Sequence, residues 1–267
     1  MRLNSSPSLS LVAMALSAFV AAAFGAGVSP SKFELSARPG EILRDTVTIF
    51  NPGGEPEDFE LKTADWRLTD EGGVEFVEDS LLEDSCRPWV RLERRNVRVG
   101  GGAEKNYRFE VHVPDDAADG LCRFAIIVEP TESFRAQVGS GGVSIPMVAR
   151  YAVITYVTIG EAVADTEYLG LGTQTVGGHR LPTVTFRNRG TTYDRAFGRI
   201  VATDSAGQRI PMVPSTFPVL PGRSETLTLV LDMDAESADE LTLVYPLSLR
   251  GQIEIGGQVF RIEETLD

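Results

Sequence analysis

The sequence is poor in the residues that most enzymes and metal sites use. Its 267 residues include only two histidines and two cysteines. His112 and His179 have no cysteine or second histidine at metal-ligand spacing, and the chain has no G-x-S-x-G elbow, P-loop or dinucleotide fingerprint. We therefore expect no enzymatic activity, no metal site and no cofactor.

Positive charge is also scarce. The chain has 25 basic and 38 acidic residues, which gives a formal net charge of −13. A surface of this sign repels phosphate backbones, so we expect no nucleic acid partner. Arg87, Arg91, Arg94, Arg95 and Arg98 nevertheless lie close together in the sequence. They either bind an anionic group bidentately or form a solvated strand face that balances the many acids.

Only the start of the chain has a long apolar run. Residues 9–24 follow Arg2 and end in the small residues around Ala23 and Gly25. This pattern is typical of an export signal, and the run is short for a membrane span, which needs ~20 residues. An uncleaved membrane anchor is the alternative. We expect residues 1–25 to be a signal peptide and the mature protein to be soluble in the periplasm.

The two cysteines fit this expected location. In an oxidising compartment an even number of cysteines favours disulfide formation. We therefore expect a bond between Cys86 and Cys122, with two buried free thiols as the alternative.

The mature chain has almost no apolar pattern of helical period, apart from single turns at 115–120 and 234–240. It has short alternating runs instead, such as DTVTIF, NYRFEVHV and ETLTLVLD, bounded by Gly, Pro, Asn or Asp. TVTIFNPGG (46–54) and TVTFRNRGT (183–191) form a weak internal repeat. We predict an all-β fold of two tandem immunoglobulin-like β-sandwich domains, residues 26–158 and 159–267.

Two local features have a structural interpretation. VPDDAADG (113–120) lacks the ligand spacing of a calcium loop, so we expect a turn between two strands. Trp66 and Trp89 are both expected in the core.

The segment VSIPMVARYAVITYV (143–157) alternates apolar residues over an unusual length. Pro146 cannot donate to a sheet ladder, which places the first part of the segment at an edge or a bulge. Val143, Ile145 and Met147 either pack into their own sandwich or belong to an exposed edge that can accept a partner strand. From Tyr151 onward we expect a core strand.

Five stretches carry a family resemblance through their order and spacing. They are SPSKFELSARPGE, VTIFNPGGEPEDFELKTADW, SCRPWVRLE, GGGAEKNYRFEVHVPDDAADGLCRFAIIVE and the segment 143–157. Together they resemble the amino-terminal domain of periplasmic pilus-assembly chaperones. The resemblance implies two immunoglobulin-like domains set in an L around a cleft. It also implies partners that are protein subunits of a pilus or other surface appendage, and an outer-membrane assembly protein.

The resemblance also implies site residues. Such chaperones lend alternating apolar side chains of the last amino-domain strand to an incomplete subunit, which here implies Val143, Ile145 and Met147. They anchor the subunit's terminal carboxylate with a cleft arginine and a lysine, but the aligned positions here fall on or near Leu35 and on Ala152. The remaining anchor candidates in this chain are Arg150, Lys32 and Arg38. The alternative function is a structural or adhesive envelope protein that binds proteins or glycans through its loops, through the arginine-rich strand or through its second domain.

Overall fold

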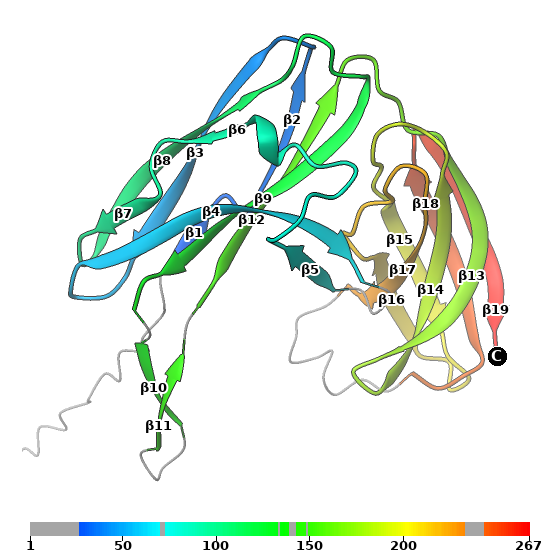
Figure 1. Ribbon diagram of the computed structural model, residues 1–267. Coiled ribbons are helices and arrows are strands. Elements are labelled where there is room, and N and C mark those ends of the chain that lie inside the picture. Colours follow the sequence, from blue (N-terminus) through cyan, green and yellow to red (C-terminus); the bar gives the residue numbers. More distant parts are fainter. Residues whose placement is uncertain (1–26, 70–72, 133, 139–142, 148, 233–242) are drawn as a thin grey trace, which may run out of the picture.

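A computed structural model describes residues 27–69, 73–132, 134–138, 143–147, 149–232 and 243–267, with the backbone alone described for 134–138 and 143–147. The chain folds almost entirely into strands, arranged as two sandwiches in tandem (Figure 1). This confirms the predicted all-β fold. The predicted signal peptide lies outside the described residues. In the described part of the chain no helix is long and apolar enough to cross a membrane.

The first half packs two sheets against each other. One sheet has the order β1-β3-β8-β6, and the other has the order β2-β12-β9-β4-β5, with β7 paired to β4. The strands of the first sheet are β1 (Gly27–Ser29), β3 (Ile42–Asn51), β8 (Ala103–His112) and β6 (Val90–Leu92). Those of the second are β2 (Lys32–Ala37), β12 (Tyr151–Ile159), β9 (Gly120–Pro130), β4 (Glu57–Leu68), β5 (Val74–Val77) and β7 (Asn96–Val99).

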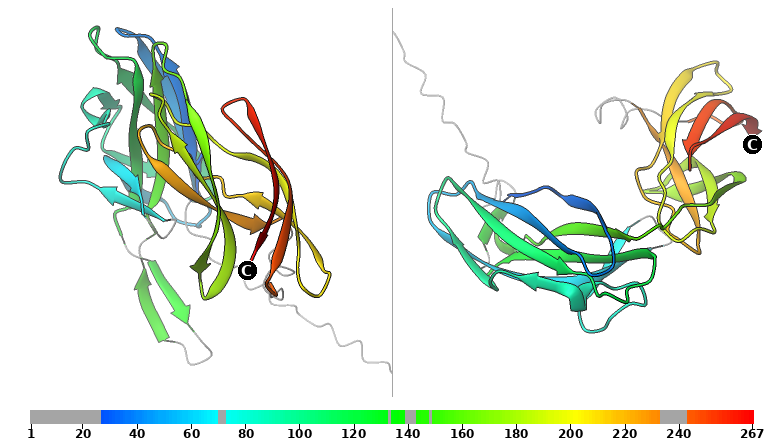
Figure 2. Two further views of the ribbon diagram at one scale, coloured as in Figure 1. Left: turned by 90° about the vertical axis from the view of Figure 1, so that its right-hand side faces the viewer. Right: turned by 90° about the horizontal axis from the view of Figure 1, so that it is seen from above.

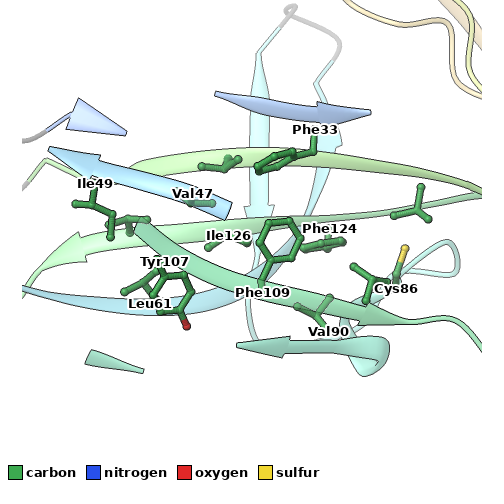
Figure 3. Packing of buried hydrophobic residues seen from close by; sticks show 14 of the residues in the cluster. Phe33, Val47, Ile49, Leu61, Cys86, Val90, Tyr107, Phe109, Phe124 and Ile126 are labelled. Atoms are coloured by element: carbon green, nitrogen blue, oxygen red, sulfur yellow. The ribbon is translucent and has the colours of Figure 1, made fainter. Parts of the chain in front are cut away.

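Aromatic rings fill the space between these sheets (Figure 3). Phe109 of β8 contacts Phe33 of β2 and Phe124 of β9 edge to face, with ring centres 5.2 and 6.2 Å apart. The expected Cys86–Cys122 disulfide is present, with the Cα atoms 5.4 Å apart. It ties the segment that contains a short 3-10 helix (Arg87–Trp89) to β9.

The seven strands of the second half are hydrogen-bonded along one path that folds over on itself, so that two layers enclose a second core. Its order is β13-β14-β17-β16-β15-β18-β19. The strands are β13 (Thr166–Val176), β14 (His179–Asn188), β15 (Phe197–Thr203), β16 (Arg209–Pro214), β17 (Ser224–Leu231), β18 (Leu247–Ile255) and β19 (Gln258–Leu266). The outermost strands meet through Tyr168 and Phe260, whose ring centres are 5.7 Å apart. The two halves meet at an angle, near one end of each (Figure 2).

The two copies of the internal repeat form the same set of hydrogen bonds, one set in each half. Asn51 ends β3 and donates its amide to the carbonyls of Glu55 and Val99, at 2.8 and 3.2 Å. Asn188 ends β14 and donates to Thr192 and Val219, at 2.7 and 3.0 Å. In both cases the amide oxygen accepts a hydrogen bond from the backbone N–H two residues later. The repeat therefore reflects a buried asparagine that, in both halves, ends a strand and hydrogen-bonds the backbone of the loops beside it.

Several local expectations have an outcome in the structure. The segment 113–120 forms the expected turn, closed by a hydrogen bond from the Ala117 N–H to the Pro114 carbonyl at 3.2 Å, and no helical turn forms there. Trp66 is buried as expected, and Trp89 packs partly buried against the first core. The strand β18 begins directly after Pro246, which cannot donate to a ladder. The helical turn expected at 234–240 lies outside the described residues.

Candidate partner-binding site

A two-stranded hairpin extends away from the first sandwich (Figure 1). It consists of β10 (Phe134–Val138) and β11 (Val143–Met147), which follow β9 and precede β12 in the chain. Within the described residues, β11 pairs with no strand other than β10. β12 pairs with β9 along its whole length but with β2 only from Ile154 onward. One side of β11 and of the first part of β12, from Tyr151 to Val153, is therefore an unpaired strand edge among the residues that the structure describes.

Val143, Ile145 and Met147 occupy alternate positions of this open strand. Their side chains lie outside the described residues, so their role in binding a partner strand stays a prediction. The expectation that the segment becomes a core strand at β12 is confirmed, because Val153 and Val157 are buried in the first core. The segment thus changes from one paired side to two along its length.

Arg150 lies at the base of the hairpin and is already engaged by the chain. Its guanidinium pairs with Glu78, and its Nε lies 3.2 Å from a carboxylate oxygen of Glu129. Lys62 of β4 pairs with the same two carboxylates, at 2.8 and 3.3 Å. Hydrogen bonds from Lys62 and Arg150 hold the pKa of Glu78 below its usual value. A carboxylate from a partner would therefore meet an arginine that already pairs with Glu78 and Glu129.

The other two anchor candidates lie apart from Arg150. Lys32 is opposite Ile154 in the parallel pairing of β2 with β12, so it lies about 13 Å along the strand from Arg150. It pairs with Glu34 at 2.8 Å. Arg38 follows the end of β2 and is about 30 Å from Arg150 by the same count. The structure does not bring the three basic residues into one site.

The aligned family positions also supply no cation. Leu35 is partly buried against the first core, on the inner face of its sheet. Its neighbour Glu34 is on the outer face and brings a negative charge instead. Ala152 lies on the outer face of β12, within a second apolar cluster. This chain therefore places a carboxylate close to where the resemblance implies an arginine.

That second cluster covers the outer face of the larger first-half sheet, and sequence reasoning missed it. Trp66 and Tyr156 pack edge to face there with ring centres 5.2 Å apart. The Arg123 guanidinium lies 4.4 Å from the centre of the Trp66 ring, and Leu220 of the second half is buried in the same cluster. A strand whose odd- and even-numbered residues are both apolar is typically buried on both faces of its sheet. The run YAVITYV (151–157) has that pattern. This signal would have indicated the second layer.

The arginine-rich stretch binds its own chain. Arg87 has a largely buried side chain and donates to the carbonyls of Val77, Ser80 and Glu78. Arg98 pairs with Asp58 at 3.1 Å. These contacts favour the structural interpretation of the stretch over an anion site. The described residues contain no group of three or more metal-ligating side chains.

Comparison with known proteins gives matches in structure alone. No protein-family model and no curated protein matches the chain. Similar solved structures include one described as a chaperone-tip adhesin complex of CFA/I fimbriae biogenesis, at 10% identity and a TM-score of 0.47, covering 87% of this chain and 98% of that one. The Pseudomonas aeruginosa CupB2 chaperone has 12% identity and a TM-score of 0.43, covering 88% and 97%. The Salmonella enterica SafA pilin–SafB chaperone complex has 12% identity and a TM-score of 0.46, covering 90% and 97%.

Proposed function

We propose that this protein is a chaperone-like protein that binds subunits of a pilus or another surface appendage by β-strand addition. The observation that carries the proposal is the unpaired edge of β11, on a hairpin that extends from the sandwich, together with the unpaired start of β12 from Tyr151 to Val153. An open edge offers main-chain N–H and C=O groups to an extended segment, and alternate side chains give specificity. Val143, Ile145 and Met147 are the proposed contacts to the subunit.

The ion cluster of Arg150, Lys62, Glu78 and Glu129 lies at the base of the hairpin, where the carboxyl terminus of a bound subunit strand would end. Arg150 and Lys62 together face Glu78 and Glu129, so a terminal carboxylate of the subunit would take the place of Glu78 on Arg150. Guanidinium groups bind carboxylates bidentately, which suits such an exchange. The predicted export places the protein in the periplasm, where an outer-membrane assembly protein would receive the loaded subunit.

The test uses the full chain co-expressed with a tagged pilus subunit. Ile145→Asp puts a charge at a proposed contact, and Ser144→Asp is the matched control because it lies at the other parity of the same strand. We expect the amount of protein recovered with the subunit to fall with Ile145→Asp and to stay near the native level with Ser144→Asp. Amide hydrogen exchange across 143–153 should slow in the complex, because the new ladder protects the edge.

Two results would contradict the proposal. Equal recovery with both variants would mean that these side chains do not contact the subunit. Unchanged exchange across 143–153 in a stable complex would mean that binding uses another surface. That second result would favour a structural or adhesive protein that binds through its loops or its second half.

A further inference from the structure

The two halves share one packed junction. Tyr193, in the loop that follows β14, lies against Tyr156 of β12 with ring centres 4.6 Å apart. Leu220 of the second half is 2% exposed and belongs to the apolar cluster on the first-half sheet. The hydroxyls of Thr158 and Thr192 are 3.0 Å apart across the same junction. The contact therefore has both an apolar layer and polar bonds.

Arg195 is the centre of this junction. Its Nη2 and Nε lie 3.0 and 3.1 Å from a carboxylate oxygen of Glu34, which is on the other half of the protein. Its Nη1 donates to the carbonyl of Thr216. The guanidinium also lies 5.2 and 5.4 Å from the centres of the Tyr156 and Tyr193 rings. With 13% of its side chain exposed, Arg195 is shielded from water, which strengthens each of these contacts.

The chain between the halves is bound to the second half. The N–H of Thr191 donates to the carbonyl of Val163 at 2.7 Å, and the N–H of Arg189 donates to that of Asp165 at 2.8 Å. A Cβ on Gly190 would lie 2.3 Å from the Val163 carbonyl oxygen, so this loop and the connecting segment are in close contact. The connecting segment from Val163 to Asp165 is therefore held as part of the second half.

The residue that Arg195 binds is on an exposed strand. In the part of the chain that the structure describes, β2 is at the end of its sheet and is hydrogen-bonded only to β12 within that sheet. Edge strands with one partner open more readily than central strands. Arg195 reaches Glu34 on β2 and Tyr156 on β12, so it spans the one ladder that holds β2 in place.

We propose that Arg195 is a positioning residue that couples the two halves, so that β2 and the loop containing residues 189–196 open together and not separately. The second half then supports the sheet from which the hairpin extends. This coupling concerns the junction alone and holds whether or not the open edge receives a partner strand.

The test is hydrogen exchange of the full chain with three single variants. Arg195→Gln and Glu34→Gln each remove the ion pair. Arg189→Gln is the control, because Arg189 is in the same loop and pairs at 2.5 Å with Glu167 of its own half. We expect Arg195→Gln and Glu34→Gln each to speed exchange in both β2 and residues 189–196, by about tenfold. We expect Arg189→Gln to leave β2 unchanged.

A second measurement separates coupling from simple loss of structure. The double variant Glu34→Gln/Arg195→Gln should open no faster than Arg195→Gln alone, since the ion pair is already absent in that single variant. Exchange in β8, which lies in the opposite sheet, should stay at the native rate and shows that the half remains folded. Faster exchange confined to residues 189–196 in Arg195→Gln, with β2 unchanged, would overturn the proposal. So would additive effects of the two single variants.

Discussion

The ion pair between the buried Arg123 and the partly buried Asp84 should lose very different amounts of stability depending on which partner is replaced. Arg123 lies on β9 with 4% of its side chain exposed, and its Nε and Nη2 lie 2.7 and 2.5 Å from one carboxylate oxygen of Asp84. Its Nη1 has no hydrogen-bond partner among the described residues. Asp84 is therefore the main charged support of a guanidinium that water hardly reaches.

The two ways of breaking this pair should differ in cost. Asp84→Asn leaves the buried cation without its counter-charge, and removing one partner of a buried pair costs about 3–5 kcal/mol. Asp84 is 33% exposed, so water offsets part of this loss and we expect a value near 3 kcal/mol. Arg123→Met removes the charge and keeps an unbranched chain over the Trp66 ring. Replacing buried charge with apolar volume is often close to neutral, so we expect a change of about 1 kcal/mol or less.

Urea unfolding followed by tryptophan fluorescence measures both variants, because Trp66 and Trp89 are the chain's two tryptophans and both belong to the first half. Adding Arg123→Met to Asp84→Asn should restore most of the lost stability, since the unpaired charge is then absent. The reasoning fails if Asp84→Asn costs less than about 1 kcal/mol. It also fails if Arg123→Met costs as much as Asp84→Asn.

Two further predictions concern the disulfide and pH. The Cys86–Cys122 bond closes a separation of 36 residues, so reducing it should lower the free energy of unfolding by about 4 kcal/mol on the chain-entropy model. Urea midpoints with and without reductant measure this, and a loss below ~1 kcal/mol would contradict the entropic account. Burial raises the pKa of Tyr193 to about 12, and nearby Glu34 adds to the shift. Its contribution is complete below the unfolded-state pKa of about 10 and is lost as the pH rises toward 12. Unfolding midpoints should therefore fall over this range, and less steeply in Tyr193→Phe; an identical slope in the variant would refute the assignment.

Much of the fold could be predicted because its signals are local. Alternation marks a strand that buries one face, and β3, β8 and β17 have that pattern. Asn51 and Asn188 each follow an alternating TVT run. The amide oxygen of each accepts a hydrogen bond from the backbone N–H only two residues later in the chain. The strands β13 and β16 have weaker local signals. β13 contains Gly170 and Gly172, which weaken strand propensity, and β16 contains two prolines.

The candidate site could be predicted only in part. Pro146 indicated that the segment starts at an edge or a bulge, because a residue without an N–H cannot sit in a central ladder. It left open whether Val143, Ile145 and Met147 pack into their own sandwich. The ion cluster at the base of the hairpin was not predictable beyond Arg150, since Lys62, Glu78 and Glu129 come from three separate segments. Nothing in the sequence separates these two acids from the other 36.

The sequence by itself determined the clearly alternating strands such as β3, β8 and β17 and which of their faces is buried, because these follow from neighbouring residues and from the period of two. The tertiary structure alone decided which charges meet. Glu34 and Arg195 are 161 residues apart, and neither stands out among the 63 charged residues of the chain. Their contact depends on how two folded sandwiches pack, since a long-range ion pair leaves no periodic mark in either segment.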